Sequence, residues 1–195
     1  MNLQAIRKEM RARRRALTDA EHDTCAESMA RRLAATNWFQ RSRRVACYLA
    51  VDGELDPEPV IQRAWALGKT VYLPVLDPLC DRLWFASYDP GDRLAKNRFG
   101  IPEPVHLDGR RIPPWTLDLV LTPLVAFAAH GERLGMGGGF YDRTFAYLRG
   151  RRCWHKPRLV GLAYEFQKIP SLTRREWDIP LHGCATDQGL YRWRL

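Results

Sequence analysis

The chain has 195 residues, of which 46% are hydrophobic and 27% charged, and its formal net charge at pH 7 is +9. This composition excludes an intrinsically disordered chain, and the length predicts one globular domain over residues 1–195 that needs no disulfides or structural metal. The charge favours an anionic or phosphorylated partner, and residues 1–44 contribute +6 of it, with 11 Lys and Arg against 5 Asp and Glu.

The N-terminal half alternates helical and strand patterns. Residues 3–17 form an amphipathic pattern typical of a helix, and Thr18 with Glu21 forms a capping-box pattern that begins a second helix over about residues 19–36. We expect residues 1–36 to pack as a basic helical segment on the remaining core. A buried strand is predicted over residues 44–50, and a helix then follows from Asp56 to Leu67.

The C-terminal half continues the alternation. Residues 89–116 are rich in Gly, Pro and charge and indicate a long surface excursion, and a helix is predicted to begin near Tyr141. Further strands are predicted over residues 70–75, 83–88, 117–122, 158–164 and 189–193. Because the main strands are apolar on both faces and alternate with helices, we predict an α/β fold with an open, mostly parallel sheet flanked by helices.

A glycine-rich stretch is the sharpest chemical feature. Gly135, Gly137, Gly138 and Gly139 lie between a predicted strand and a predicted helix, and Arg133 and Arg143 flank them. Glycines there let backbone N–H groups approach a phosphate, and the arginines add charged donors. Asp142 follows at once and is a natural Mg²⁺ ligand. The alternatives are a flexible turn and, for Asp142, an ordinary acidic residue at a helix start.

Three acidic residues follow the strand predicted over residues 44–50. Ligands of open α/β sheets bind at the carboxyl ends of the strands, where Asp52, Glu54 and Asp56 could accept hydrogen bonds from a heterocycle. Asp56 is equally explained as a helix N-cap before Pro57. Phe99, within residues 99–104, could stack on a planar ring or fill the space under the long loop.

Cysteine and histidine patterns exclude several kinds of site. No C-x-x-C pair occurs, so we expect reduced thiols and a cytoplasmic protein rather than a disulfide framework or a zinc ribbon, with Cys25, Cys47, Cys80, Cys153 and Cys184 scattered along the chain. No ligand spacing or nucleophile triad involves the histidines His22, His106, His130, His155 and His182. No secretory signal and no run of 18 apolar residues is present, so no membrane partner is expected.

The motif LTPLVAF at residues 121–127, followed by GERLGMGGGFYD at residues 131–142, resembles the signature of the 5-formyltetrahydrofolate cyclo-ligase family. The resemblance extends to the basic first helix and to residues 52–57, 99–104 and 177–180. It implies an open α/β fold related to sugar-phosphate isomerase and CoA-transferase domains. It also implies an ATP- and Mg²⁺-dependent ligase that converts 5-formyltetrahydrofolate, with or without a polyglutamate tail, to 5,10-methenyltetrahydrofolate.

The resemblance further assigns roles to individual residues. ATP would be bound by Arg7, Lys8, Arg11, Arg133, Leu134, Gly135, Met136, Gly137, Gly138, Gly139, Phe140 and Tyr141. The folate would be bound by Val51, Glu54, Asp56 and Phe99, and also by Met136, Gly137, Gly138, Gly139 and Phe140. Catalysis would depend on Arg133, Tyr141 and Asp142, and Asp142 would hold Mg²⁺.

Three positions depart from the family pattern. Arg7 stands where the family has lysine, Ala128 replaces a frequent Asp, and His182 occupies the place of an acidic residue linked to Mg²⁺ in some members. We do not expect His182 to bind a hard cation.

Two other functions compete with the ligase. One is a nucleotide- or RNA-binding module that lacks the chemistry, and the other is an enzyme such as a sugar-phosphate isomerase, for which no clear acid–base pair is visible. We expect a monomer or weak dimer without nucleic acid, and the further arginines Arg13, Arg14, Arg15, Arg31 and Arg32 are assigned mostly to solvent.

Overall fold

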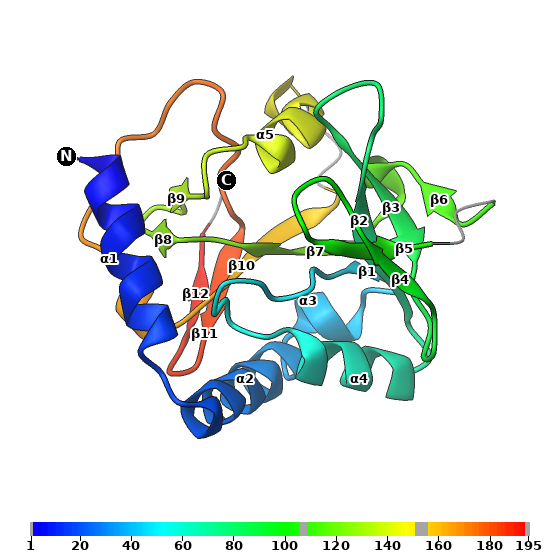
Figure 1. Cartoon of the computed structure of the whole chain (residues 1–195), viewed down its shortest axis with the longest axis horizontal. Coiled ribbons are helices and arrows are strands. Elements are labelled where there is room, and N and C mark those ends of the chain that lie inside the picture. Colours follow the sequence, from blue (N-terminus) through cyan, green and yellow to red (C-terminus); the bar gives the residue numbers. More distant parts are fainter. Residues whose placement is uncertain (1, 106–108, 151–155, 194–195) are drawn as a thin grey trace.

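A mixed sheet forms the centre of the computed structural model, which describes residues 2–105, 109–150 and 156–193. Within these residues the sheet has eight strands in the order β12-β11-β10-β7-β1-β2-β3-β6 (Figure 1). The parallel strands are β1 (Arg44–Ala46), β2 (Thr70–Leu76), β7 (Leu119–Pro123), β10 (Arg158–Ala163) and β11 (Gly183–Thr186). Antiparallel pairing adds β3 (Leu83–Ser87), β6 (Arg111–Ile112) and β12 (Leu190–Arg192). The predicted α/β fold with a mostly parallel sheet is confirmed, whereas the relation to isomerase and transferase domains stays a prediction.

Helices cover both faces of the sheet. Successive strand residues point to opposite sides, so a strand that is apolar throughout needs cover on both faces. Leu119 and Leu121 of β7 join one core cluster, and Val120 joins the other. Against the first face pack α2 (Asp19–Ala34), α3 (Asn37–Gln40) and α4 (Glu58–Ala66), which lie below the sheet in Figure 1. Against the second face pack α5 (Phe140–Thr144) and the 3₁₀ helix Ala146–Gly150. The apolar character of both strand faces therefore reflects burial on both sides.

The N-terminal helix α1 (Leu3–Arg15) packs on a separate small hairpin. This hairpin pairs β8 (Ala126–Phe127) with β9 (Arg133–Leu134) and leads directly into the glycine-rich stretch. Met10 is buried against it, and Leu3 and Ile6 pack around the same cluster. The predicted apolar stripe of this helix is confirmed at these three positions, and it attaches α1 beside the glycines (Figure 1).

Several boundaries differ from the sequence prediction. The strand predicted over residues 44–50 ends at Ala46, because the following residues leave the sheet and line a cavity. The excursion over residues 89–116 contains a hairpin of β4 (Leu94–Lys96) and β5 (Pro102–Pro104), then β6 and the 3₁₀ helix Pro114–Thr116. The predicted capping box of α2 is present, with Glu21 N–H donating to Thr18 Oγ1 over 3.3 Å.

The structure describes the state of four cysteines and tests for membrane-spanning helices. Cys25, Cys47, Cys80 and Cys184 are free thiols. No helix within the described ranges is long and apolar enough to cross a membrane. Cys153, His106 and His155 lie outside the described residues.

Candidate active site

A cavity of about 1030 Å³ opens at the carboxyl ends of β1, β2 and β7. Tyr48, Leu76 and Leu124, which end or closely follow these strands, line its floor together with Glu54 from the turn after β1. Its walls come from α1, from residues 97–103, from the glycine-rich stretch and from residues 172–180. This volume lies at the upper end of the range for small-molecule sites, and the position is the usual one in open α/β sheets.

The glycine loop, residues 135–139, forms one wall of the cavity. Gly137 has a φ of 108° and Gly139 a φ of 64°, a conformation that side-chain-bearing residues rarely adopt. Arg7 Nε donates to the Gly135 carbonyl over 2.9 Å, and Arg143 Nη2 donates to the Gly138 carbonyl over 2.6 Å. Two guanidinium groups thus lie beside a loop whose backbone is exposed, which is an arrangement suited to binding a polyanion.

Asp142 stands just beyond the glycine loop. Its Oδ1 accepts from Arg133 Nη2 over 2.6 Å and from the Ile179 N–H over 3.0 Å. The described residues contain no group of three or more His, Cys, Asp or Glu able to hold a metal ion. A single carboxylate does not form a complete metal cage, but it fits Mg²⁺, which is usually bound by one or two carboxylates together with substrate phosphates.

Tyr141 lies beside Arg133 on the same wall. The Arg133 guanidinium lies 5.7 Å from the centre of the tyrosine ring. Burial raises the pKa of Tyr141 above its ordinary value, although the charge of Arg133 opposes the shift. The phenol therefore stays protonated at neutral pH and can act as a hydrogen-bond donor.

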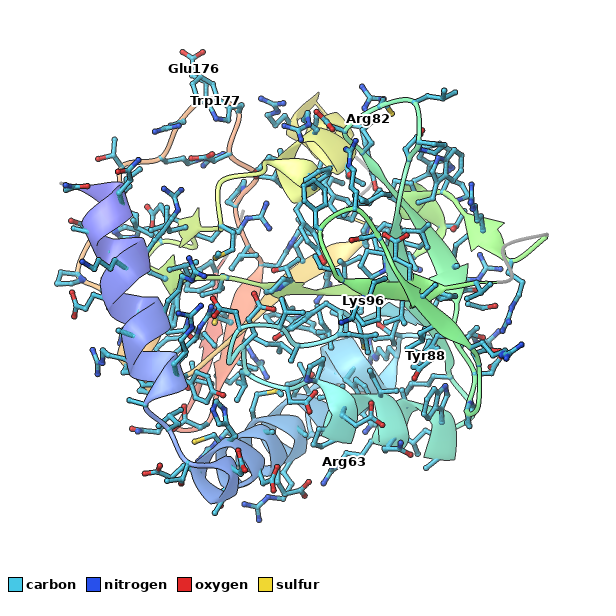
Figure 2. The ribbon with its side chains drawn as sticks, viewed as in Figure 1. Arg63, Arg82, Tyr88, Lys96, Glu176 and Trp177 are labelled. Carbon is cyan, nitrogen blue, oxygen red and sulfur yellow. The ribbon has the colours of Figure 1, made fainter. Side chains whose placement is uncertain are left out.

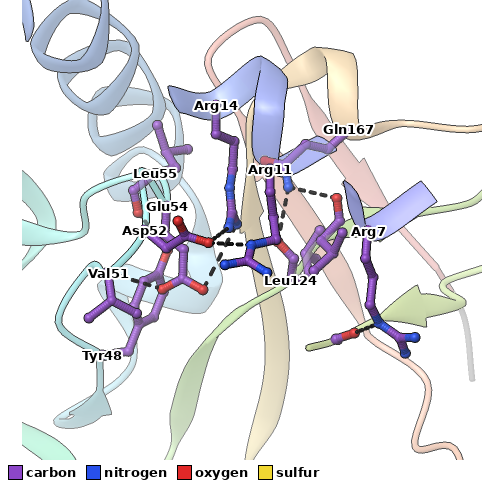
Figure 3. Close-up of polar contacts among 12 residues, drawn as sticks. Arg7, Arg11, Arg14, Tyr48, Val51, Asp52, Glu54, Leu55, Leu124 and Gln167 are labelled. Atoms are coloured by element: carbon purple, nitrogen blue, oxygen red, sulfur yellow. Dashed lines mark hydrogen bonds and ion pairs between the residues drawn. The ribbon is translucent and has the colours of Figure 1, made fainter. Parts of the chain in front are cut away.

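Glu54 is a nearly buried carboxyl group on the cavity floor, with an exposed fraction of 9%. Burial raises its pKa to about 7, and the nearby positive charge of Arg14 limits the shift. Its Oε2 accepts from the Val51 N–H over 3.3 Å, and Arg14 Nη1 lies 3.9 Å from Oε1 (Figure 3). Glu54 therefore changes protonation near neutral pH and can either accept or donate a hydrogen bond.

Phe99 lies at the mouth of the cavity on a turn that Asn97 holds. Asn97 Oδ1 accepts from the N–H groups of Phe99 and Ile101, and its Nδ2 donates to Glu103 Oε1 over 2.7 Å. The Phe99 ring is 55% exposed and contacts Phe140 edge to face, with ring centres 5.6 Å apart. An exposed aromatic face beside the glycine loop is suited to binding a flat heterocycle.

Most of the predicted site residues lie together. The cavity is lined by Arg7, Val51, Glu54 and Phe99 and by the whole stretch from Arg133 to Asp142. Three predicted residues lie outside the lining. Lys8 is exposed, Arg11 Nε donates to Asp52 Oδ2 over 2.5 Å, and Asp56 Oδ1 accepts from the Glu58 N–H over 2.9 Å at the start of α4. The hydrogen bond from the Glu58 N–H thus supports the alternative role of Asp56, which is to cap the start of α4.

The assignment of Arg14 to solvent is wrong. Arg14 is 0% exposed and lies beside Asp52 and Glu54. Arg15 is exposed, as expected, and its Nε also donates to Asp52 Oδ1 over 2.5 Å. Both arginines contact acidic residues of the turn that follows β1, far away in the sequence. The spacing of arginines along one face of α1 indicates a shared partner, but the sequence alone does not identify Asp52 and Glu54 as that partner.

Residues 172–180 form a wall that the sequence motifs identified only in part. Arg174, Arg175 and Trp177 line the cavity, and Figure 2 shows Trp177 at the outer end of the segment. His182 lies just beyond it, and its Nδ1 accepts from the Leu159 N–H over 3.1 Å. His182 is not among the residues that line the cavity.

The chain is similar to known proteins over nearly its whole length. The model of the 5-formyltetrahydrofolate cyclo-ligase family matches residues 2–187. The 5-formyltetrahydrofolate cyclo-ligase of Escherichia coli (strain K12) is 42% identical over 186 residues, which cover 94% of this chain and 100% of the relative. That of Haemophilus influenzae is 38% identical over 181 residues, covering 91% and 94%. The NMR structure of Aquifex aeolicus 5,10-methenyltetrahydrofolate synthetase superimposes with a TM-score of 0.82 at 31% identity, covering 100% of this chain and 94% of that one.

Proposed function

The chain belongs to the 5-formyltetrahydrofolate cyclo-ligase family, and from this we propose that it converts 5-formyltetrahydrofolate and ATP to 5,10-methenyltetrahydrofolate, ADP and phosphate. The observation that carries the proposal is the cavity at the carboxyl ends of β1, β2 and β7. The cavity is lined by the glycine loop with Arg7 and Arg143 beside it, by the Asp142 carboxylate and by the exposed ring of Phe99. These are the groups needed to bind a nucleotide phosphate beside a flat heterocycle.

We propose that the reaction proceeds by phosphoryl transfer followed by ring closure. The formyl oxygen attacks the γ-phosphate of ATP and displaces ADP. N10 then bonds to the activated carbon and loses its proton, and phosphate leaves with the former formyl oxygen. Arg7, Arg133 and the N–H groups of the glycine loop would neutralise charge on the phosphates, and Tyr141 would donate a hydrogen bond. Bringing two substrates together supplies much of the catalysis, so no nucleophilic side chain is required.

Asp142 is the residue we propose to hold Mg²⁺. Its carboxylate lies beside the glycine loop, where it could share the ion with phosphate oxygens. Mg²⁺ bound there would supply positive charge to the transferring phosphate. Arg133 would hold the Asp142 carboxylate in place through the ion pair that the two residues form.

We propose that the folate binds against Val51, Glu54 and Phe99 and against Met136 to Phe140. Glu54 would accept hydrogen bonds from N–H groups of the heterocycle, and the ring of Phe99 would lie against it. Lys8, Arg11 and Asp56 stay proposed contacts, which they would make only if α1 or the turn at residues 52–57 moved. A polyglutamate tail on the folate is compatible with the arginines on residues 172–180.

We further propose that residues 1–195 act as one cyclo-ligase domain, in the cytoplasm, as a monomer or weak dimer without nucleic acid. The packing of α1 on the β8–β9 hairpin supports a single unit, because this helix supplies Arg7 to the cavity. The free thiols of Cys47 and Cys184, both buried, are compatible with a reducing compartment.

The test is an assay that mixes the protein with MgATP and 5-formyltetrahydrofolate and follows both the methenyl chromophore and ADP release. We expect equal amounts of the two products and none without ATP. A matched control is Arg41→Ala, which removes an exposed arginine after α3 and should leave turnover unchanged. Well-folded protein that forms no methenyl product would overturn the proposal. Salt-sensitive RNA binding in that case would favour the binding-module alternative.

A further inference from the structure

Asp52 occupies an unusual backbone position in the turn after β1. Its φ is 54°, and no other non-glycine residue in the described ranges has a positive φ. Gly53 follows with a φ of 69°, and a Cβ atom at Gly53 would lie 3.3 Å from Arg14 Cβ. The turn therefore holds a non-glycine residue in the left-handed region and passes close enough to α1 that a side chain at Gly53 would be crowded.

The Asp52 carboxylate binds three arginines of α1, of which Figure 3 labels Arg11 and Arg14. Its Oδ2 accepts from Arg11 Nε over 2.5 Å and lies 3.5 Å from Arg14 Nη2, and its Oδ1 accepts from Arg15 Nε over 2.5 Å. Burial opposes ionisation of Asp52, but the hydrogen bonds from Arg11 and Arg15 hold the pKa of its carboxyl group below the usual value. Asp52 is therefore an anion that fixes one end of a helix.

The same helix face carries Arg7, one turn before Arg11 in the N-terminal half of α1. Arg11 lies four positions after Arg7, and Arg14 and Arg15 lie three and four positions after Arg11, so these residues share one side of α1. Arg7 Nε donates to the Gly135 carbonyl over 2.9 Å. Arg7 Nη2 also lies 3.7 Å from the place where a Cβ of Gly137 would stand. Because a helix of this length moves nearly as a rigid rod, the Asp52 contacts restrict where the Arg7 side chain can lie.

The other contacts of α1 are fewer or less directional than those with Asp52. Leu3, Ile6 and Met10 pack in the apolar cluster around the β8–β9 hairpin, and the Arg13 guanidinium lies 4.4 Å from the centre of the Phe166 ring. Arg14 Nη1 also lies 3.9 Å from Glu54 Oε1. Apolar contacts hold a helix against a surface but are non-directional, whereas arginine–carboxylate pairs are directional. The charged contacts with Asp52 thus contribute most to the angle at which α1 presents Arg7 to the cavity.

We infer that Asp52 is a positioning residue for nucleotide binding, an inference that rests on the proposed ATP-dependent function. Asp52 holds α1 through Arg11, Arg14 and Arg15, so that Arg7 stays beside the glycine loop. Asp52 does not line the cavity, so it would act on ATP through α1 and not by direct contact. Its loss should weaken ATP binding while phosphoryl transfer in the bound complex continues.

The test uses Asp52→Asn, which removes the charge while asparagine still tolerates a positive φ. Kinetics are measured at pH 8.5, where Glu54 is ionised. We expect the KM for ATP to rise about five- to tenfold, with kcat within about twofold of the original value. The matched control is Glu27→Gln, which neutralises a carboxylate paired with Arg63 between α2 and α4, away from the cavity (Figure 2). It should leave the KM for ATP unchanged.

A double-mutant cycle shows whether Asp52 acts through Arg7. In an Arg7→Gln background, Asp52→Asn should raise the KM for ATP by less than about twofold, because the group it positions is already lost. Full additivity of the two substitutions would overturn the inference. So would an equal loss of kcat and ATP affinity in Asp52→Asn, since that indicates general damage.

Direct ATP binding, measured by calorimetry on the wild-type protein and Asp52→Asn, separates the two proposals. If the wild-type protein binds no ATP, the proposed function is wrong. If the wild-type protein binds ATP and Asp52→Asn binds it equally well, the proposed function stands and the positioning role of Asp52 is wrong. Weaker binding by Asp52→Asn with an unfolding temperature like that of Glu27→Gln supports the role.

Discussion

Arg133 and Asp142 tie the two ends of the glycine loop together, with Nη2 of Arg133 2.6 Å from Oδ1 of Asp142. The Arg133 side chain is only 6% exposed, and the same carboxylate oxygen also accepts the Ile179 N–H. The loop between them is therefore closed at its base and connected to residues 172–180. A phosphate in this loop would meet a cation and a carboxylate whose positions are already fixed.

Asp142→Asn should lower Mg²⁺-dependent turnover. The amide oxygen can still accept from Arg133 and from the Ile179 N–H, while the negative charge that pairs with Arg133 is lost. We expect kcat to fall on the order of 10- to 100-fold and the Mg²⁺ requirement to rise, as for the loss of a charged contact. Steady-state rates across a Mg²⁺ titration provide the measurement.

The control for this prediction is Asp178→Asn. Asp178 also lines the cavity, but its Oδ2 accepts from the Arg175 N–H and it forms no ion pair with Arg133. Turnover of Asp178→Asn should change by less than about threefold. Equal losses in the two variants would show that the total negative charge of the cavity matters, rather than a Mg²⁺ ligand.

Arg133→Ala should weaken both ATP use and stability. It removes a proposed phosphate contact and leaves Asp142 without its partner, so the KM for ATP should rise at least about tenfold and the free energy of unfolding should fall by about 1–3 kcal/mol. Denaturant unfolding and ATP kinetics measure the two effects. Adding Asp142→Asn to Arg133→Ala should recover part of the stability but none of the ATP use. If the stability of the double variant shows no recovery, the unpaired carboxylate is not the cause of the loss.

Glu54 should make stability fall as pH rises. Its pKa is about 7 in the folded protein against an ordinary value of 4.5, so between these pH values the folded protein keeps a proton that the unfolded chain has lost. Raising the pH therefore favours unfolding, by up to about 3 kcal/mol across this range. Denaturant unfolding from pH 5 to pH 8 should show the wild-type protein losing stability relative to Glu54→Gln. A constant difference between the two proteins would contradict the raised pKa.

Phe99→Ala should weaken the binding of the folate and leave the binding of ATP unchanged. Removing the ring takes away the exposed aromatic face and its contact with Phe140, and we expect the KM for 5-formyltetrahydrofolate to rise about fivefold or more. The KM for ATP should stay within about twofold. Trp115→Ala is the matched control, because Trp115 is 49% exposed but lies outside the cavity lining. A similar rise in the ATP KM would place Phe99 in the nucleotide site instead.

The sequence predicts the fold well where the local pattern reflects burial. Strands such as β7 and β10 are apolar on both faces, and only a sheet covered on both sides buries such strands. The strand β11 was not predicted, because its four residues, Gly183 to Thr186, include glycine, cysteine and alanine and have little strand preference. Its place in the sheet comes from pairing with β10, a contact that no local pattern contains.

The site is predictable where one short segment supplies its chemistry. The glycine loop with Arg133 and Asp142 is such a segment, and its residues line the cavity together. Arg14 was assigned wrongly, because its burial depends on Asp52 and Glu54, which lie about forty residues later in the chain. The local pattern of a basic helix favours solvent, and only the folded chain brings these charges together.

Gly137→Ala should impair ATP use without unfolding the protein. Gly137 has a φ of 108°, which costs a side-chain-bearing residue about 1–3 kcal/mol. Residues 135–138 are exposed, so the loop can relieve this strain by changing its own conformation while the core stays intact. We expect the KM for ATP to rise at least about tenfold, since the backbone N–H groups would no longer converge on phosphate.

Gly135→Ala is the matched control for this substitution, because a Cβ there meets nothing within 4 Å and the φ of Gly135 is not positive. Its KM for ATP should stay within about twofold, and both variants should unfold within a few degrees of the wild-type protein. Kinetics and thermal unfolding of the pair provide the measurement. If the two substitutions impaired ATP use equally, the added side-chain volume beside the loop would be the cause of the loss, and the backbone conformation of Gly137 would not. Selective loss in Gly137→Ala would show that the left-handed backbone at this position is what shapes the phosphate site.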